Sequence, residues 1–266
     1  MIRFQEMIGL SQAQYIYCNT NPVSDIIYHQ VPAISIQEAA AMDVLDAINK
    51  RHSVRAFKPD PVPQDILRKI IEGALRAPSA SNSQPWEFSI VSGAKLEEIK
   101  QAYIDNSTQM PNLDVPIPFQ YPEPWISRRA AVMAGVLEKM GVEREDKQKR
   151  MEWGQFGFRL WGAPSCIYIM IDSAFHHADN GTNMWNLFDC GLIAQNIMLL
   201  ATAQGLGSIP AIIPVLYPDI QRRVLGLPAS KLMVLGIPVG YTDDTNPANK
   251  FRSSREPLDN VARFYG

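Results

Sequence analysis

The sequence has few cysteines, and their arrangement excludes several protein classes. Its 266 residues contain only Cys18, Cys166 and Cys190, and no two of them form a CxxC pair. An odd number of thiols without paired spacing argues against a disulfide framework or a zinc site. Such thiols are typical of a reducing compartment, and the sequence therefore predicts a cytoplasmic protein.

The chain also lacks a marked excess of charge of either sign. Its formal net charge is −2, and its lysines and arginines do not form the dense clusters that bind nucleic acid. Its N-terminus has no basic segment followed by an apolar core, and we find no apolar run approaching the ~20 residues that cross a bilayer. We therefore expect a soluble protein that acts on small molecules, with neither nucleic acid nor a membrane as partner.

No internal repeat or linker divides most of the chain, and its apolar share of 46% is that of an ordinary globular protein. Residues 1–38 differ, because they mix apolar and polar side chains without a clear period and are interrupted by Pro22 and Pro32. We interpret residues 1–38 as an N-terminal extension and residues 39–266 as one domain.

The spacing of apolar residues predicts the main elements of this domain. Helical periodicity indicates helices over residues 37–49, 63–75, 95–103, 127–141, 143–160, 185–204 and 220–225. Strand patterns occur at residues 86–91, 165–171 and 233–239, and residues 206–213 form a loop or a strand. Residues 105–125 are rich in proline and aromatic residues without periodicity, which is typical of a functional or mobile segment.

One stretch, residues 51–88, carries most of the chemistry. It opens with Arg51, His52, Ser53 and Arg55, placed within five residues just after an amphipathic run. Guanidinium groups and a hydroxyl that converge where a helix ends suit a phosphate or an electron-rich heterocycle. The stretch closes with small polar residues at 78–84, which can bring backbone and amide groups close to a planar ligand.

In this order and at this spacing, the two segments resemble the FMN-dependent nitroreductase family, which includes reductive dehalogenases of the iodotyrosine deiodinase type. The resemblance continues through residues 162–164, 189–191, 205–210, 237–241 and 255–258, and it covers about residues 40–266. It implies an α+β fold with a mixed β-sheet flanked by helices. It also implies an intertwined homodimer with FMN at the subunit interface and NAD(P)H as the electron donor.

The resemblance also implies which residues bind the cofactor. Arg51, Ser53 and Arg255 match positions that hold the ribityl phosphate, and Arg252 is the alternative to Arg255. Arg55 matches a base beside the N1 and O2 edge of the flavin, where a fixed cation stabilises the reduced anion. The side chain of His52 either takes part in binding or only packs.

Two further segments match the family's flavin contacts. Residues Pro78, Ser79, Ala80, Asn82 and Gln84 match a loop that reaches the flavin of the opposite subunit. Residues Pro210, Ala211 and Ile212 match a segment that lines the ring edge near N5 through its backbone, and its apolar character leaves the preferred reaction open. Because the flavin itself accepts and donates hydride, no catalytic side chain is assigned.

The irregular segment and a histidine pair offer further candidates. Phe119, Tyr121 and Trp125 are candidates for a lid that stacks on the substrate, although aromatic residues there also simply pack. His176 and His177, with Asp179 nearby, do not predict a metal site, because adjacent histidines point apart and no other ligand has a useful spacing.

Our interpretation is an oxidoreductase in which NAD(P)H reduces FMN and leaves, and a nitroaromatic, quinone or similar electron-poor acceptor then replaces it in a ping-pong cycle. One alternative is reductive dehalogenation or reduction of an activated alkene, for which a charged lid triad around a zwitterionic substrate would be diagnostic. The other alternative is a module that stores or delivers FMN without turnover.

Overall fold

A computed structural model describes residues 42–117, 120–177 and 181–266. The chain divides into two compact units, Met1–Ser35 and Ile36–Gly266, and all described residues belong to the second. The N-terminal extension predicted over residues 1–38 lies outside the described residues. Its proposed boundary with the domain therefore stays a prediction.

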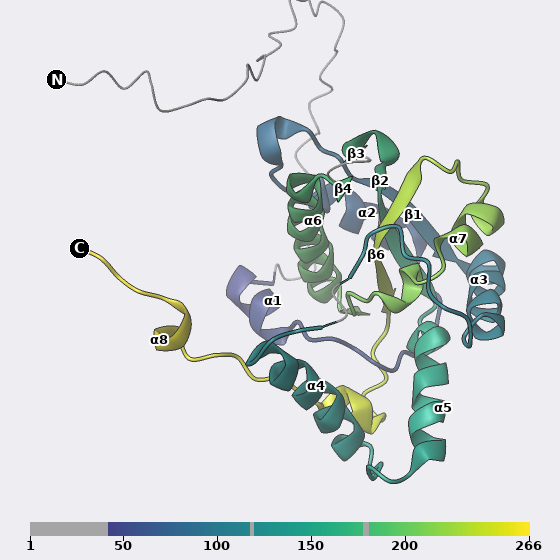
Figure 1. Ribbon diagram of the computed structural model, residues 1–266, viewed down its shortest axis with the longest axis vertical. Coiled ribbons are helices and arrows are strands. Elements are labelled where there is room, and N and C mark those ends of the chain that lie inside the picture. Colours follow the sequence, from purple (N-terminus) through teal and green to yellow (C-terminus); the bar gives the residue numbers. More distant parts are fainter. Residues whose placement is uncertain (1–41, 118–119, 178–180) are drawn as a thin grey trace, which may run out of the picture. The chain divides into compact units, whose positions relative to one another are not determined.

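A four-stranded sheet forms the centre of the second unit (Figure 1). In spatial order its strands are β1 (Glu87–Ser92), β2 (Ser165–Asp172), β6 (Lys231–Gly240) and β5 (Gly207–Ser208). Neighbouring strands pair antiparallel throughout. The parallel component expected of a mixed sheet is, in the described part of the chain, a single bridge between Ser53 and Ser208. The three strands predicted from sequence are confirmed as β1, β2 and β6.

Helices surround the sheet, and some of them lie beyond its edges (Figure 1). The described α-helices are α1 (Val44–Lys50), α2 (Gln64–Ala74), α3 (Gly93–Asp105), α4 (Trp125–Lys139), α5 (Lys147–Phe158), α6 (Met184–Ala203), α7 (Pro218–Leu225) and α8 (Leu258–Val261). Two-residue strands β3 (His176–His177) and β4 (Gly181–Thr182) form a separate hairpin. Single 3₁₀ turns occur at Ala80–Asn82, Leu160–Gly162, Ser173–Phe175, Ile213–Val215 and Pro247–Lys250.

Two helix starts differ from the sequence prediction, and side-chain caps explain both. Asp43 accepts a hydrogen bond from the Leu45 amide at 2.8 Å, so α1 begins at Val44 rather than near residue 37. Asp146 accepts from the Lys149 amide at 3.0 Å, so α5 begins at Lys147 rather than at residue 143. The other predicted helices are confirmed within a few residues.

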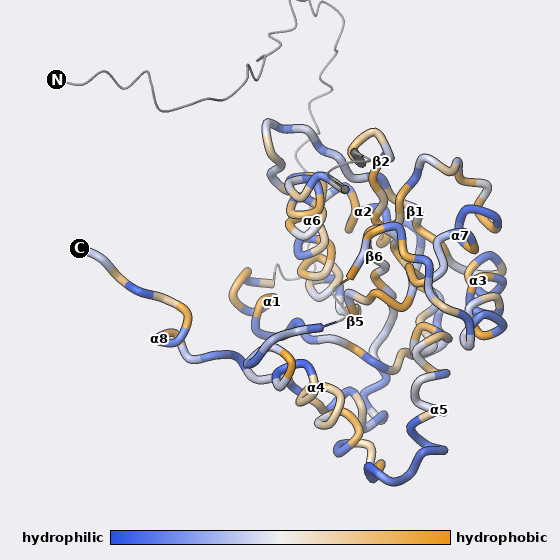
Figure 2. Tube along the Cα trace, in the orientation of Figure 1, coloured by the Kyte–Doolittle hydropathy of each residue, from blue (hydrophilic) through white to orange (hydrophobic). Residues whose placement is uncertain are grey.

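The core has two halves, one on each face of the sheet. Ile167, Ile169 and Ile171 of β2 pack with buried residues of α2 and α6. The alternating residues Cys166 and Tyr168 pack with buried residues of α3, α5 and α7. This period of two places β2 between two apolar layers, as predicted for a strand buried on both faces. Figure 2 shows the apolar residues along β2 and α6.

Helix α6 also meets a test that the sequence analysis did not register. This 20-residue helix contains an 18-residue window with a mean hydropathy of 1.2, and it is long and apolar enough to cross a membrane by length and composition. Ile193, Ile197 and Ala201 are nevertheless buried against α2 and the sheet. In this fold α6 is therefore a core helix.

Candidate functional site

Two segments from opposite ends of the domain line one cavity. The first begins in the last turn of α1 and continues beyond it, the second precedes α8, and α6 contributes one residue. The cavity measures about 580 Å³ and is lined by Ile48, Asn49, Arg51, His52, Ser53, Arg55, Gln195, Phe251, Arg252, Ser253 and Arg255. We call it the arginine cavity after Arg51, Arg55, Arg252 and Arg255. The structure therefore brings together six of the residues predicted from sequence to bind a cofactor, Arg51, His52, Ser53, Arg55, Arg252 and Arg255.

Backbone pairing fixes the first segment. The chain turns from helical to extended at Arg51, whose amide donates to the Ala47 carbonyl at 3.0 Å and ends α1. It then runs beside β5, because the Val54 amide donates to the Ser208 carbonyl at 3.0 Å. The short extended run thus holds the side chains at 51, 53 and 55 in a fixed order.

Asn249 joins the first segment to the second. Its Oδ1 accepts from the Arg55 amide at 2.6 Å, and its Nδ2 donates to the Ala56 carbonyl at 2.8 Å and to the Asp243 carbonyl at 2.9 Å. The residue is only 5% exposed, so these bonds are shielded from water. Asn249 was missed by the sequence analysis, because an asparagine in a polar tail gives no sign of a partner 194 residues away.

The cavity carries positive charge without a compensating carboxylate. Among the described residues, no ion pair links Arg51, Arg55, Arg252 or Arg255 to an aspartate or glutamate. Burial lowers the pKa of Arg51, and the nearby charge of Arg255 lowers it further. Burial also lowers the pKa of Arg55. The protein therefore holds several guanidinium groups close together at a cost that a bound anion would offset.

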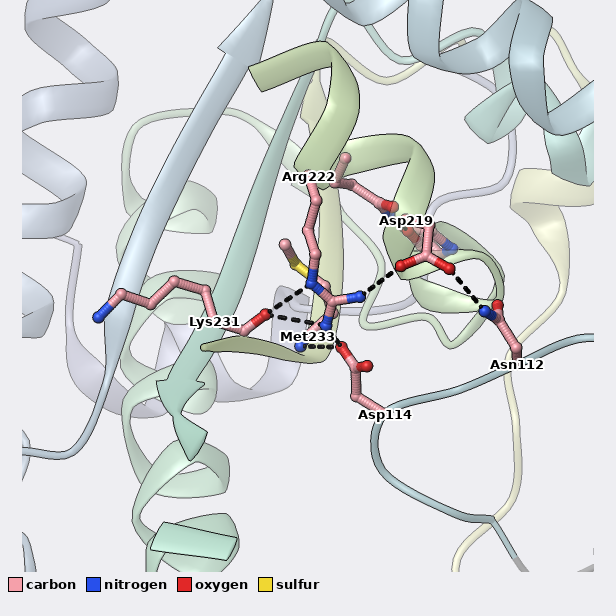
Figure 3. Close-up of polar contacts among 8 residues, drawn as sticks. Asn112, Asp114, Asp219, Arg222, Lys231 and Met233 are labelled. Atoms are coloured by element: carbon pink, nitrogen blue, oxygen red, sulfur yellow. Dashed lines mark hydrogen bonds and ion pairs between the residues drawn. The ribbon is translucent and has the colours of Figure 1, made fainter. Parts of the chain in front are cut away.

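Arg222 shows how this protein treats an arginine with a purely structural role (Figure 3). Its Nη2 lies 2.5 Å from Asp114 Oδ2, and its Nη1 lies 2.9 Å from Asp219 Oδ1. Although burial opposes the shift, these two carboxylates raise the pKa of Arg222. Asp114 also accepts from the Met233 amide at 2.8 Å, so the network ties the middle of the irregular segment to α7 and β6. The arginines of the cavity have no such partners.

His52 is held in its neutral form beside these arginines. Its Nδ1 lies 2.9 Å from the Lys50 carbonyl, so Nδ1 carries the proton and Nε2 is free to accept. Burial is the main cause that lowers the pKa of His52, and the charges of Arg252, Arg51 and Arg55 act in the same direction. The hydrogen bond to Lys50 only partly opposes the change.

The loop predicted to reach a flavin lies elsewhere in the same chain. Residues 78–84 do not line the arginine cavity. Their shape is set locally, because Ser79 Oγ accepts from the Gln84 amide at 3.0 Å. Ser81, Asn82 and Gln84 have φ values of 51°, 57° and 46°, a region that few residues other than glycine adopt. Such strain persists only where surrounding contacts hold it.

Asp189 is the contact that holds this loop. It lies on α6, is 1% exposed, and its two carboxylate oxygens lie 3.1 and 3.2 Å from the Ala80 amide. One turn earlier on α6, Asn186 is also buried, and its Nδ2 has no partner among the described residues. The sequence analysis assigned no role to Asp189. The sequence did contain a sign of this role, because Asp189 is a carboxylate within a strongly apolar helix, and a buried carboxylate requires a hydrogen-bond partner.

The remaining predicted residues also lie outside the arginine cavity. Ala211 exchanges backbone hydrogen bonds of 2.9 and 3.2 Å with Gly236 of β6, while Pro210 and Ile212 are exposed. Trp125 is the first residue of α4 and is 53% exposed. The guanidinium of Arg129 lies over the ring of Tyr121, 5.2 Å from its centroid. Phe119, the third lid candidate, and Asp179, which we considered as a metal ligand, lie outside the described residues.

A phosphorylated ligand is the class of partner that this cavity fits. Arginines that pair with no carboxylate among the described residues, together with the Ser53 hydroxyl, supply hydrogen-bond donors and positive charge in one open site. The fold and this site together define an α+β protein with a cavity suited to a phosphate-bearing cofactor. A profile described as the nitroreductase family matches residues 48–241, and the chain belongs to that family.

Individual relatives agree with this assignment. The chain is 32% identical over 238 residues to nitroreductase NfnB of Mycolicibacterium smegmatis, covering 88% of this chain and 95% of that protein. It is 27% identical to a nitrobenzene nitroreductase of Ectopseudomonas oleovorans over 82% of this chain and 95% of the relative. The crystal structure of FMN-dependent NfnB from Mycobacterium smegmatis with NADPH superposes with a TM-score of 0.76 at 30% identity, covering 84% of this chain and 100% of that one.

Proposed function

We propose that this chain is an FMN-dependent oxidoreductase that takes electrons from NAD(P)H and reduces nitroaromatic or similar electron-poor acceptors. The arginine cavity is the observation that carries the proposal, because it offers a phosphate-binding site at the positions that the resemblance assigns to FMN. The relatives support the chemistry, since they include nitroreductases named for nitrobenzene and 4-nitrobenzoate. When bound, FMN would supply the hydride transfer, and the protein would bind and orient it.

Arg51, Ser53 and Arg255 are the residues that we assign to the FMN phosphate. Arg255 is close enough to Arg51 to lower its pKa, so a phosphate dianion between the two guanidinium groups would replace a repulsion by two attractions. The charge of Arg252 instead lowers the pKa of His52, and it is not among the causes that lower the pKa of Arg51. We therefore favour Arg255 over Arg252 as the second phosphate clamp.

Arg55 has a position suited to tuning the flavin. Its Nη1 donates to the Ser53 carbonyl at 3.2 Å, and its guanidinium lies 5.8 Å from the centroid of the Phe251 ring. These contacts fix a positive charge beside the phosphate site without neutralising it. We assign to Arg55 the stabilisation of the anion that forms when the flavin is reduced.

We further propose that the functional unit is a homodimer. Val44, Leu45 and Ile48 expose apolar side chains on α1, and Trp185 and Phe188 do so on α6, with exposed fractions of 48% to 66%. The two helices pack together, and Ile48 also lines the arginine cavity. An apolar surface that adjoins the cofactor cavity fits an interface between two copies.

In such a dimer, the loop at residues 78–84 would complete the site of the other subunit. The loop lies outside the arginine cavity of its own chain, yet Asp189 holds it in a strained and defined shape at α6. The segment with Pro210, Ala211 and Ile212 would then line the flavin edge through its backbone. Tyr121 and Trp125 remain our candidates for the acceptor lid.

We also infer a cytoplasmic protein in which the two cysteines of the described residues, Cys166 and Cys190, are not reactive. Cys166 and Cys190 are buried and not joined in a disulfide. Burial is the main cause that raises the pKa of each thiol to about 12. Both therefore stay protonated and serve as apolar core side chains.

An anaerobic titration tests the proposed function. The purified protein, saturated with FMN, is titrated with NADPH and with NADH, and the reduced protein is then mixed with 4-nitrobenzoate, a quinone or a halotyrosine. We expect a nicotinamide to bleach the flavin band and the nitroarene to restore it. Restoration by the halotyrosine alone would favour dehalogenation, and failure of both nucleotides to bleach the flavin would favour a storage module.

A further inference from the structure

A second cavity lies on the other side of the C-terminal segment. It measures about 750 Å³ and is lined by Ser127, Arg128, Ala131, Val132, Phe251, Arg252, Ser253, Ser254, Arg255 and Glu256. Its first four lining residues belong to α4, and four of the others also line the arginine cavity. We call it the α4 cavity. Figure 1 shows α4 beside the C-terminal segment, and residues of this segment line both cavities.

The contact between α4 and the C-terminal segment is closely built. A Cβ atom at Gly135 would collide with Cε2 of Phe251, so glycine lets α4 approach this ring closely. At the helix start, Arg128 Nε lies 2.9 Å from Glu256 Oε1. The ring and the ion pair therefore both join α4 to the C-terminal segment.

The chemistry of the α4 cavity suits a phosphate attached to a nucleoside. Three guanidinium groups, those of Arg128, Arg252 and Arg255, face a single carboxylate, that of Glu256. Ser127, Ser253 and Ser254 add hydroxyl donors, while Ala131, Val132 and Phe251 supply apolar surface. Arginine forks and hydroxyls recognise a phosphate monoester, and an apolar wall beside them accepts a base.

Arg128 is the group best placed to select such a ligand. Its Nε holds Glu256, and its two terminal nitrogens have no acceptor within the described parts of the chain. Its side chain is 43% exposed, so it can reach an entering anion without rearranging the core. Arg255, in contrast, is assigned above to the FMN phosphate.

We propose that the α4 cavity binds the adenosine 2′-phosphate of NADPH, with Arg128 as the residue that distinguishes NADPH from NADH. This inference rests on the proposed function, because it assumes that a nicotinamide reaches the flavin. The adenosine half of the dinucleotide then needs a site beside the flavin cavity, and the α4 cavity shares a wall with it. NADH lacks the 2′-phosphate and would leave Arg128 with Glu256 alone.

Direct binding tests the proposal without relying on turnover. Adenosine 2′,5′-bisphosphate and adenosine 5′-monophosphate are titrated calorimetrically into the FMN-loaded protein. We expect the bisphosphate to bind at least about tenfold more tightly, the effect of one charge-assisted contact. Arg128→Gln should abolish this preference and lower the NADPH/NADH ratio of kcat/KM about tenfold.

Three further variants sharpen the result. Lys139→Gln removes a positive charge from the last turn of the same helix and should keep the preference. Arg128→Lys should retain part of the preference for the bisphosphate that Arg128→Gln loses. Glu256→Gln should increase this preference, because it removes the carboxylate that competes for Arg128. Equal binding of the two nucleotides to the wild-type protein, or an undiminished preference in Arg128→Gln, would overturn the proposal. A protein that binds the bisphosphate selectively but takes up no FMN would instead contradict the proposed function.

Discussion

Arg255→Gln should weaken FMN binding and at the same time stabilise the protein that lacks FMN. Loss of one charge-assisted hydrogen bond to a phosphate costs about 1.5–3 kcal/mol, which corresponds to a Kd about 10- to 150-fold higher. The charge of Arg255 lowers the pKa of Arg51, so the two guanidinium groups repel each other in the empty cavity. Both side chains are partly exposed, and relief of this repulsion is worth about 0.2–1 kcal/mol.

These two effects have opposite signs and are measured separately. Fluorescence titration of the apoprotein with FMN gives the Kd, and thermal unfolding without FMN gives the change in Tm, about 1–3 °C upward for a domain of this size. Arg263→Gln, which removes a charge further along the same exposed tail, should change neither quantity. An unchanged Kd in Arg255→Gln would refute the phosphate assignment. A lower Tm would show that Arg255 acts mainly through its bonds to Ser253 and Ser254.

Three more perturbations follow from contacts in the site. Asp189→Ala leaves the Ala80 amide without its acceptor, which costs about 1–3 kcal/mol of stability, and it should weaken FMN binding. Asp189→Asn keeps an acceptor and should restore much of the FMN affinity. Equal FMN affinity in the wild-type protein and both variants would contradict the role of Asp189. The pKa of His52, measured by NMR, should lie below 6.5 in the apoprotein and rise when FMN binds. Because the pKa is lower in the folded than in the unfolded protein, the free energy of unfolding should fall as the pH drops through 6.5. A pKa above 6.5 in the apoprotein would contradict this prediction. Gly135→Ala should displace Phe251 and cost about 1–3 kcal/mol in denaturant unfolding, whereas Gly154→Ala on α5, where a Cβ meets nothing within 4 Å, should not be destabilising.

The sequence predicted the structure correctly where the informative residues lie close together along the chain. The apolar run at residues 165–171 predicted β2, because a strand buried on both faces leaves no polar position. The cluster of Arg51, His52, Ser53 and Arg55 predicted half of the arginine cavity, because these residues follow a helix end at once. The resemblance added Arg252 and Arg255, which composition alone would place in an ordinary polar tail.

The sequence did not predict the contacts in which a single side chain joins segments far apart along the chain. Asn249 accepts a hydrogen bond from Arg55, 194 positions away, and Asp189 accepts one from Ala80, 109 positions away. Neither contact has a periodic signature, because each depends on how the helices pack on the sheet. The caps at Asp43 and Asp146 are local signals, but both predicted helices were begun earlier, and the one at residue 143 was begun within a charged run.

The account depends most directly on recognition of a phosphate by the arginine cavity. FMN and riboflavin share the same ring system and differ in that phosphate, so their affinities for the apoprotein isolate its contribution. We predict that FMN binds on the order of 100-fold more tightly than riboflavin, and that inorganic phosphate reduces the difference by competing for the cavity. Equal affinities for the two flavins, insensitive to phosphate, would contradict the account.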